Sequence, residues 1–326
     1  MGRVAVIAEL GNNAAGDVAL AQRMIDAAQA CGADVVKFQA IHPRQLVGAD
    51  HPAVGLLERE SFRDADFAAL KEHCDRAGIE FLATPFDLDG IDLLEQLGVR
   101  RYKVASGELT WPGFLRAVGR TRKPVIMSTG GATEEQVEQA LGWLRDGGAQ
   151  EITLLHCVSA YPPPDDELNL PRIPYLRQRF GLPAGFSDHS AGWEMAVAAI
   201  ALGAAVIEKH FTIDRSLPGV DNPMSILPAD LRNIVAAARR LPAALQDRGT
   251  GAQPSEQGFV TGGRRGLYAA RDLPAGTVLA AGDVVALRPV GELTPYDLPR
   301  VLGKKLLCSV TAGAALAAAA FAPDGN

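Results

Sequence analysis

The chain has 326 residues, of which 48% are hydrophobic and 21% are charged, and its formal net charge at pH 7 is −6. This size allows one large domain and a smaller one, and the lack of a basic stripe argues against nucleic acid as a partner. The four cysteines, Cys31, Cys74, Cys157 and Cys308, lie far apart without a CxxC pair, which is typical of reduced thiols in a cytoplasmic protein and argues against a disulfide framework or a zinc knot.

Short apolar runs rich in β-forming residues recur along the first two thirds of the chain. The first of them reaches polar residues too soon for a signal peptide. The runs span residues 3–10, 33–39, 79–85, 101–106, 124–130, 151–157, 184–190 and 204–210. Segments with helical periodicity lie between them, and several end in glycine, as helix C-caps do. These segments are 17–32, 66–78, 133–148 and 192–203.

A repeated alternation of strand and helix predicts a parallel sheet. Eight such units suit a closed (β/α)₈ TIM barrel, which we place at residues 1–245. The alternative is an open doubly wound sheet, which would have a GxGxxG turn after its first strand. The first strand is followed instead by "ELGNNAAGD", so the sequence favours the barrel.

The barrel is followed by a predicted linker and a small second domain. Residues 246–263 are rich in Gly, Pro, Ser and Gln and have no apolar period, which indicates a linker. Residues 264–326 alternate short β-like runs with Pro/Gly turns, so we expect a small β-rich domain there. The apolar tail "GAALAAAAF" has about half the length needed to cross a bilayer, and we expect no membrane association.

Polar or ionisable residues stand at the carboxyl end of every predicted strand. In a TIM barrel the active site is built at that end. A single lysine or Ser-Asp pair there has an ordinary explanation as a solvated group or a helix cap, but the whole set would converge on one mouth. Its members include Glu9, Lys37, Gln39, Thr84, Lys103, Ser106, Glu108, Ser128, Ser159, Tyr161, Ser187, Asp188, His189, Glu208, Lys209 and His210.

Two lysines and several hydroxyls in this set suit a phosphorylated or carboxylated anion. Lys37 and Lys103 would supply charge, and Thr84, Ser106 and Ser128 would supply hydrogen bonds. The sequence therefore predicts an anion site at the barrel mouth.

Two histidines lie at the ends of consecutive strands. His189 and His210 could hold a divalent cation and leave positions open for substrate. They could instead be a general acid–base pair, or one ligand and one hydrogen-bonding histidine. Glu9, Glu108 and Asp221 are candidate carboxylates for proton transfer.

Nine separated motifs together resemble one known family. They are "AELGNNAAGD", "GADVVKFQ", "ATPFD", "YKVASGE", "IMSTGG", "LLHCVSAYPPP", "GFSDHS", "VIEKHF" and "RPVGELTP". Their order and spacing are similar to those of the sialic acid synthases (N-acetylneuraminate synthases), a family that includes legionaminic and pseudaminic acid synthases. The resemblance covers essentially the whole chain, including a C-terminal antifreeze-like (SAF) domain.

The resemblance implies a reaction and a role for each matching residue. Members of this family use a divalent metal ion (Mn²⁺, Mg²⁺ or Co²⁺) to condense phosphoenolpyruvate with an open-chain N-acylamino sugar aldehyde such as N-acetylmannosamine, and they release phosphate. The phosphoenolpyruvate site would be formed by Lys37, Thr84, Lys103, Ser106, Ser128, Ser159 and Ser187. The metal ligands would be His189 and His210, and Glu9 would handle the proton of the attacking water. The sugar site would be formed by Gln39, Glu108, Tyr161, Asp221 and, from the partner subunit of a domain-swapped homodimer, Arg288.

The sequence departs from the family's pattern at four positions. A histidine of the first motif is replaced by Ala14, and one that usually follows Asp221 is replaced by Asn222. Ser159 stands where some members have asparagine, and Gly131 stands where methionine is more usual. Both missing histidines belong near the expected sugar site, so the sequence predicts the reaction class but leaves the sugar open.

Two other functions are compatible with parts of the pattern. A phosphoenolpyruvate-dependent aldol synthase acting on a sugar phosphate would need an arginine-rich second phosphate site, which the acceptor end lacks. A degenerate relative could bind sugar without chemistry. Such a protein has little physical reason to keep Glu9 together with the paired lysines and histidines, so the set favours an enzyme.

Overall fold

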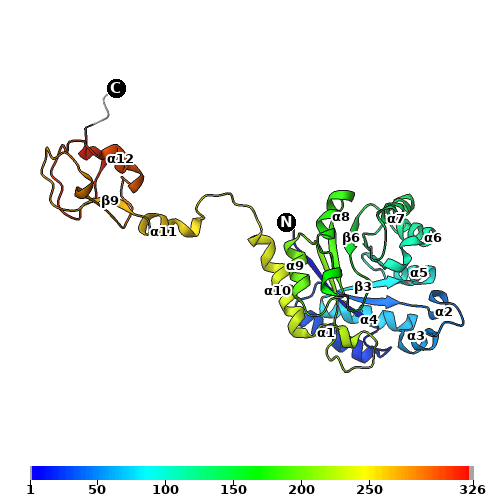
Figure 1. The fold of residues 1–326 in the computed structure, drawn as a ribbon. Coiled ribbons are helices and arrows are strands. Elements are labelled where there is room, and N and C mark those ends of the chain that lie inside the picture. The colour runs from blue at the N-terminus through cyan, green and yellow to red at the C-terminus, as the bar shows by residue number, and fades with distance from the viewer. Residues whose placement is uncertain (1, 323–326) are drawn as a thin grey trace. The chain divides into compact units, whose positions relative to one another are not determined.

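The computed structural model describes residues 2–322, which form two compact units that divide between Gln246 and Asp247 (Figure 1). The division falls one residue after the predicted end of the barrel at 245. Residues 323–326 of the predicted C-terminal domain lie outside the described residues.

The first unit is built on eight parallel strands, hydrogen-bonded in the order β3-β2-β1-β8-β7-β6-β5-β4. β3 and β4, at the two ends of this order, contact each other, so the sheet closes on itself. The strands are β1 (Ala5–Gly11), β2 (Val35–Ala40), β3 (Glu80–Pro85), β4 (Tyr102–Val104), β5 (Val125–Ser128), β6 (Ile152–His156), β7 (Ala184–Asp188) and β8 (Val206–His210). Each predicted apolar run supplies one of them, and the predicted TIM barrel is confirmed.

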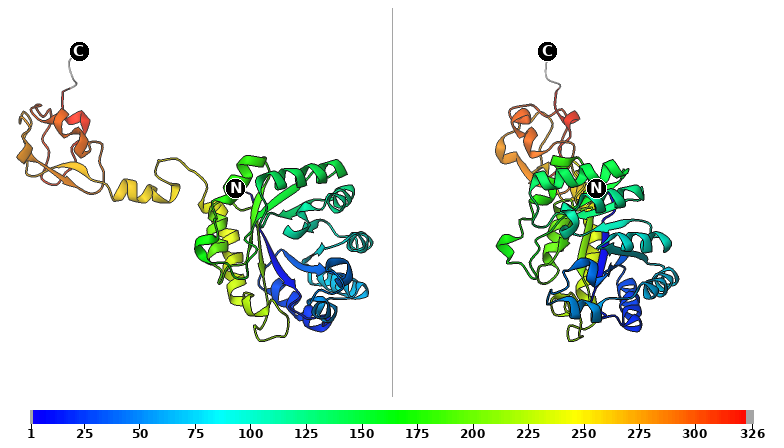
Figure 2. Two further views of the ribbon diagram at one scale, coloured as in Figure 1. Left: turned by 45° about the vertical axis from the view of Figure 1, so that its right-hand side comes forward. Right: turned by 90° about the vertical axis from the view of Figure 1, so that its right-hand side faces the viewer.

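The helices of the first unit surround the strands (Figures 1 and 2). The α-helices are α1 (Val18–Ala30), α2 (Pro43–Leu46), α3 (Val54–Glu60), α4 (Asp64–Ala77), α5 (Leu88–Gln96), α6 (Pro112–Arg120), α7 (Glu134–Gly147), α8 (Arg172–Phe180), α9 (Glu194–Ala201) and α10 (Pro228–Ala244). Short 3₁₀ turns are η1 (Ser106–Thr110), η2 (Asp165–Glu167) and η3 (Asn222–Met224).

Local sequence fixes where several helices begin and end. At the start of α1, the Asp17 carboxylate accepts a hydrogen bond from the Leu20 amide at 3.0 Å. At the start of α7, the Thr133 hydroxyl accepts from the Gln136 amide, and the Gln136 side chain accepts from the Thr133 amide. This reciprocal capping satisfies amides that the helix itself leaves unpaired. α7 ends at Gly148, whose φ of 116° is in the left-handed region that favours glycine.

A layer of apolar side chains fills the interior of the barrel, separate from the larger core between strands and helices. It consists of Ile7, Val35, Leu82, Ile126, Leu155 and Val206, one residue from each of six strands. Because side chains alternate between the two faces of a strand, residues two positions later point into the barrel as well. The apolar layer therefore forms a floor, and the next inward-facing layer lies toward the carboxyl ends of the strands.

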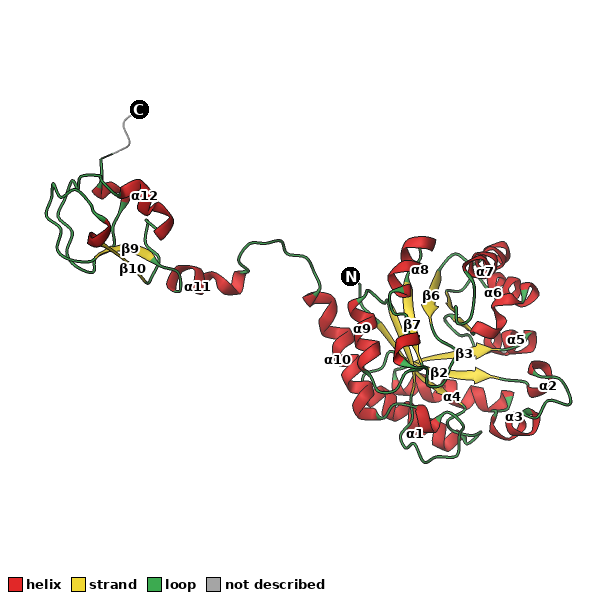
Figure 3. Ribbon diagram, in the orientation of Figure 1, coloured by secondary structure: helices red, strands yellow, loops and turns green. Residues whose placement is uncertain are grey.

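The second unit is mostly loops and short turns around one antiparallel strand pair (Figure 3). Its elements are η4 (Pro254–Glu256), α11 (Gln257–Gly262), β9 (Gly266–Ala269), η5 (Ala281–Asp283), β10 (Val284–Leu287), η6 (Pro295–Asp297), α12 (Leu298–Val301) and η7 (Ala318–Ala320). Leu267, Leu279, Leu306 and Phe321 belong to a small core of its own. The predicted linker 246–263 contains α11. No helix in residues 2–322 is long and apolar enough to span a membrane.

Candidate active site

A cavity of about 210 Å³ lies directly above the apolar floor of the barrel. Most of its lining is polar. The lining residues are Glu9, Lys37, Gln39, Thr84, Phe86, Lys103, Ala105, Ser106, Gly107, Ser128, Cys157, Ser159, Tyr161, Ser187, His189, Glu208 and His210. The structure therefore brings together most of the strand-end residues that the sequence singled out.

The alternation of strand side chains explains this composition. Each residue of the apolar floor is followed two positions later by a residue of the cavity lining. These lining residues are Glu9, Lys37, Thr84, Ser128, Cys157 and Glu208. A change from apolar to polar residues within one inward-facing row thus converts a packed barrel into a binding cavity.

Lys37 is held by groups from three neighbouring strands. Its Nζ donates a hydrogen bond of 3.1 Å to the Thr84 hydroxyl and lies 2.7 Å from Oε2 of Glu9 and 3.7 Å from Oε2 of Glu208. Burial alone would lower the pKa of Lys37, but Glu208 and Glu9 raise it above its ordinary value. Lys37 is therefore a charged ammonium group at the base of the cavity.

Lys103 occupies the corresponding place on β4. Its Nζ donates hydrogen bonds to the Ser128 hydroxyl at 2.7 Å and to the Val104 carbonyl at 3.1 Å, and it lies 3.8 Å from Oε1 of Glu208. Burial lowers the pKa of Lys103, and the attraction of Glu208 opposes this shift. The two lysines and their hydroxyl partners lie together where the sequence predicts an anion site.

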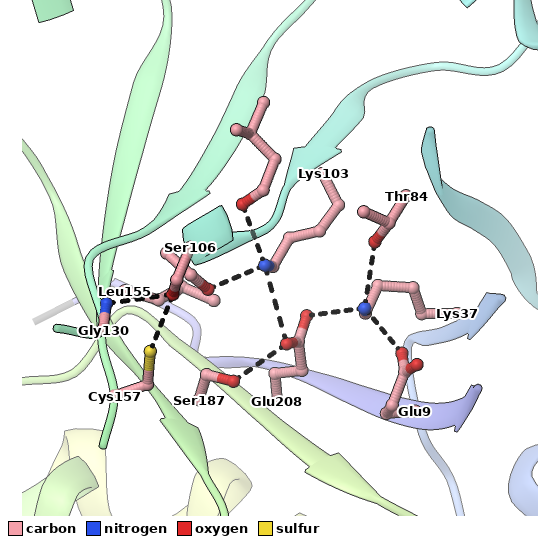
Figure 4. Close-up of polar contacts among 12 residues, drawn as sticks. Glu9, Lys37, Thr84, Lys103, Ser106, Gly130, Leu155, Cys157, Ser187 and Glu208 are labelled. Carbon is pink, nitrogen blue, oxygen red and sulfur yellow. Dashed lines mark hydrogen bonds and ion pairs between the residues drawn. The ribbon is translucent and has the colours of Figure 1, made fainter. Parts of the chain in front are cut away.

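Glu208 lies between the two lysines (Figure 4). The Ser187 hydroxyl donates a hydrogen bond of 2.9 Å to its Oε1. Burial alone would raise the pKa of Glu208, but Lys103 and Lys37 lower it to about 2, so its carboxylate is charged. Glu208 stands at a predicted strand end, but its motif alone assigns it no role. A signal was available, since Glu208 and His210 are two residues apart and face the same side of β8.

A corner of the cavity is formed by the turns after β4, β5 and β6. The Ser106 hydroxyl accepts a hydrogen bond of 2.9 Å from the Gly130 amide and lies 3.3 Å from the Cys157 sulfur (Figure 4). A side chain at Gly130 would collide with Ser106, Cys157 and Ser159. Glycine at this position is therefore required for the two serines to face the cavity.

Glu9 combines burial with two polar contacts. Besides its ion pair with Lys37, its Oε1 accepts a hydrogen bond of 3.3 Å from the Gln39 amide group. Burial raises the pKa of Glu9 to about 7, although Lys37 acts in the opposite direction. A carboxyl group with this pKa can accept and return a proton near neutral pH.

The two histidines lie on the side of the cavity formed by β7 and β8. Their ring centroids are 5.7 Å apart. Nδ1 of His189 donates a hydrogen bond of 2.8 Å to the Val158 carbonyl, which leaves Nε2 as the unprotonated nitrogen of a neutral ring, 3.5 Å from the Ser187 hydroxyl. Burial lowers the pKa of both rings, that of His210 to about 3. Nδ1 of His210 is buried, has no hydrogen-bond partner within residues 2–322, and lies 3.6 Å from Oδ2 of Asp221.

Only some of the predicted sugar-binding residues line the cavity. Gln39 and Tyr161 line the cavity. Tyr161 also lines an adjoining hollow of about 430 Å³, and Asp221 lines that hollow only. Glu108 lies in η1, outside the cavity lining, and burial raises its pKa to about 7. Arg288 is an exposed residue of the second unit, and its role at the site stays a prediction.

The residues at the two missing histidine positions are part of the packing. Ala14 is buried. Asn222 is also buried, and its side chain donates to the Asn13 and Gly219 carbonyls and accepts from the Thr212 hydroxyl at 2.5 Å. Both residues lie outside the cavity lining. The hydrogen bond from Asn222 to Asn13 joins the loop after β8 to the loop after β1.

Comparisons with known proteins agree with this architecture. The sequence profile of the NeuB family matches residues 24–250, and that of the SAF domain matches residues 264–322. The chain is 36% identical over 320 residues to the N,N'-diacetyllegionaminic acid synthase of Campylobacter jejuni. This alignment covers 93% of this chain and 96% of the relative. It is 32% identical over 330 residues to a pseudaminic acid synthase of the same species, which covers 96% of this chain and 95% of the relative.

A solved structure extends the comparison to three dimensions. The N-acetylneuraminic acid (sialic acid) synthetase of Leptospira borgpetersenii superimposes with a TM-score of 0.75 and 37% identity. The superposition covers 79% of this chain and 90% of that chain. The chain therefore belongs to the NeuB family, the sialic acid synthase family that its motifs predict, and is an enzyme of that family's transferase type.

Proposed function

We propose that this enzyme condenses phosphoenolpyruvate with an open-chain N-acylamino sugar aldehyde and releases a nonulosonic acid and phosphate. The proposal is supported by the names of the relatives, which are synthases of legionaminic, pseudaminic and sialic acids. These names differ in the sugar, so they support the common reaction more strongly than any one acceptor.

The observation that carries the proposal is one cavity with a cationic end and an imidazole end. Lys37 and Lys103, with the hydroxyls of Thr84 and Ser128, can hold a small phosphorylated carboxylate. His189 and His210 lie in the same cavity, close enough for an acceptor aldehyde to meet the bound anion. A cavity for simple anion binding would have no need of two buried neutral imidazoles.

The residues present fit a divalent cation. Nδ1 of His189 is bonded to a backbone carbonyl, the arrangement common among metal-binding histidines. Its Nε2 lies 3.5 Å from the Ser187 hydroxyl, which donates its proton to Glu208, so the Nε2 lone pair is left for a metal ion. No group of three or more His, Cys, Asp and Glu side chains in the described part of the chain could hold a metal ion, so substrate or water oxygens would complete the coordination of an ion bound to His189 and His210. Such an ion, Mn²⁺, Mg²⁺ or Co²⁺, would polarise the aldehyde as a Lewis acid.

The charge balance of the cavity also favours a cation. Two ammonium groups face the carboxylate of Glu208 and the partly ionised carboxyl of Glu9, so the protein's own charges nearly cancel. Phosphoenolpyruvate brings several negative charges into this space. A divalent ion would supply the missing positive charge.

The reaction can then be written for the bound substrates. C3 of phosphoenolpyruvate forms a bond to the aldehyde carbon with the electron pair of its C2–C3 double bond, which leaves C2 cationic. The aldehyde oxygen takes up a proton to become a hydroxyl, and this proton is balanced by the one that water later releases. Water adds to the cationic C2 and gives up a proton, for which Glu9 is the candidate acceptor. The tetrahedral carbon collapses to a ketone, and the bond between C2 and the bridging oxygen breaks so that phosphate leaves. Lys37 and Lys103 stabilise the departing charge.

The proposed reaction also needs a site for the acceptor sugar. Gln39, Tyr161 and Asp221 would contact the sugar where the cavity meets the adjoining hollow. We also propose that Glu108 contributes to sugar binding and that Arg288 reaches the acceptor from the partner subunit of a domain-swapped dimer. A guanidinium group can hydrogen-bond hydroxyl or acylamino oxygens.

The experiment that tests this function measures phosphate release from phosphoenolpyruvate. The acceptor panel would contain N-acetylmannosamine, mannose and a 2,4-diacetamido sugar, each with and without added Mn²⁺. Release that depends on one of the N-acylamino sugars supports the proposal. Folded enzyme that binds phosphoenolpyruvate but releases no phosphate with any aldehyde would favour a sugar-binding relative without this chemistry.

A further inference from the structure

One carboxylate is shared by both lysines of the anion site. Oε2 of Glu208 lies 3.7 Å from Nζ of Lys37, and Oε1 lies 3.8 Å from Nζ of Lys103. These distances are longer than hydrogen bonds, so both contacts are charge pairs. The Ser187 hydroxyl donates to Oε1 at 2.9 Å and holds the carboxylate between the two ammonium groups (Figure 4).

All three charged side chains are almost completely buried. Two ammonium groups buried without a counter-charge would be strongly destabilising or would lose their protons. Lys37 has a second carboxylate close by, because Glu9 lies 2.7 Å away. For Lys103, the carboxylate within 4 Å among residues 2–322 is Glu208. Glu208 is therefore the group that allows both lysines to be charged before an anion arrives.

The same position makes Glu208 a competitor of any bound anion. A phosphate group that accepts hydrogen bonds from Lys37 or Lys103 comes within a few ångströms of a carboxylate of like charge. Like charges at this separation in a partly desolvated cavity repel each other appreciably. The carboxylate cannot turn away freely, because Ser187 holds one of its oxygens.

We propose that Glu208 is a positioning residue that takes the place of the anion between Lys37 and Lys103 when no anion is bound, and that weakens the hold of both lysines on phosphate. The second part rests on the proposed function, in which phosphate is a product. Equal binding of substrate and product groups does not accelerate turnover, and slow product release limits many enzymes. A built-in counter-charge would let phosphate leave once its bond to carbon has broken.

The test compares the wild-type enzyme with Glu208→Gln, which keeps the shape of the side chain but removes its charge. Calorimetry with inorganic phosphate at pH 7 should give about tenfold tighter binding in the variant, on the order of 1.4 kcal/mol. Product inhibition by phosphate should strengthen in parallel, and kcat should fall while the KM for phosphoenolpyruvate does not rise. A merely structural role would weaken binding and turnover together.

Glu80→Gln is the matched control, because it makes the same change of charge at the opposite end of the barrel. Glu80 opens β3 and pairs with Arg101 at 2.7 Å, outside the cavity lining. Its phosphate affinity should equal that of the wild type. A similar tightening in this control would show a general effect of net charge and would overturn the proposal.

If Glu208→Gln does not fold, Glu208→Asp tests the same proposal. Aspartate keeps the charge but withdraws it by one methylene, so phosphate should again bind more tightly than in the wild type. Unchanged or weaker phosphate binding in the folded variants would overturn the proposal. If the wild type binds neither phosphate nor phosphoenolpyruvate, the anion site fails together with this inference. If it binds phosphate but converts no aldehyde, only the proposed reaction fails, and the affinities still decide the role of Glu208.

Discussion

Nζ of Lys103 donates a hydrogen bond of 2.7 Å to Oγ of Ser128, which joins the ends of the neighbouring strands β4 and β5. Lys37 has the same relationship to Thr84 across β2 and β3. Each lysine is thus held in place by a hydroxyl from the next strand, and each hydroxyl can contact an anion that the lysine binds. In the proposed reaction, this arrangement would preorganise the cavity for an anion before the substrate enters.

The first prediction concerns these two lysines. Lys37→Met and Lys103→Met should each weaken phosphoenolpyruvate binding by about 1.5–3 kcal/mol, a roughly ten- to hundredfold effect, because each removes a charge-assisted contact. Calorimetric titration would measure it. Lys209→Met is the matched control, since Lys209 is equally buried but pairs with Asp188 at 2.8 Å outside the cavity lining. Unchanged affinity in both cavity variants would contradict the anion site.

A second prediction concerns the metal. Chelation with EDTA should abolish activity and leave the barrel folded, because the barrel core consists of apolar contacts that involve neither histidine. Added Mn²⁺ should restore turnover. Full activity in protein shown to be metal-free by elemental analysis would refute the metal role.

The histidine variants separate metal binding from stability. His189→Ala and His210→Ala should each lose metal-dependent activity and Mn²⁺ affinity, with little change in melting temperature. Both rings line the cavity and belong to neither apolar core cluster of the barrel, which is why the fold should tolerate their loss. Mn²⁺ affinity equal to that of the wild type in both variants would show that the ion binds elsewhere.

The pH dependence of kcat should reflect the ionisation of Glu9. Its pKa is raised to about 7 by burial, so below that pH the carboxyl group is protonated and cannot accept the proton of the attacking water. The kcat should therefore rise as pH increases through about 7, not near the ordinary value for glutamate. Glu9→Gln should lower kcat and flatten this rise. A variant that retains the wild-type pH profile would assign the ionisation to another group.

The role of Arg288 can be tested by mixing two inactive variants, Lys103→Met and Arg288→Ala. In a domain-swapped dimer with random subunit exchange, a mixed dimer collects both lesions in one site and leaves the other intact. The equimolar mixture should regain about a quarter of the wild-type activity per subunit. Absence of recovery despite proven subunit exchange would mean that Arg288 serves its own barrel or none.

The barrel and most of the cavity could be predicted from the sequence because both follow from strand periodicity. Apolar runs give the strands, and parallel strands place their carboxyl ends together. Periodicity also shows which strand-end residues face the cavity. In β8, Glu208 and His210 face inward, whereas Lys209 between them pairs with Asp188 outside the cavity lining. The role proposed for Glu208 follows from this alternation and not from its place at a strand end alone.

Other features depend on loop geometry, which periodicity does not describe. Glu108 lies outside the cavity lining because the chain forms the 3₁₀ turn η1 from Ser106 onward. Asn222 is buried against the Asn13 carbonyl, a contact between residues 209 positions apart that no local pattern encodes. The expectation that the missing histidine positions lie near the sugar stays a prediction, and both neighbours of Asn222, Asp221 and Pro223, line the adjoining hollow.

In the proposed reaction, phosphate leaves by cleavage of the bond between C2 and the bridging oxygen, after water has added to C2. The most direct test is to run the reaction in H₂¹⁸O with phosphoenolpyruvate and an accepted N-acylamino sugar, and to analyse both products by mass spectrometry. We predict that freshly formed phosphate carries no label and that the label enters the nonulosonic acid at C2. Labelled phosphate, or phosphate release that does not depend on the aldehyde, would show hydrolysis at phosphorus and contradict the proposed condensation.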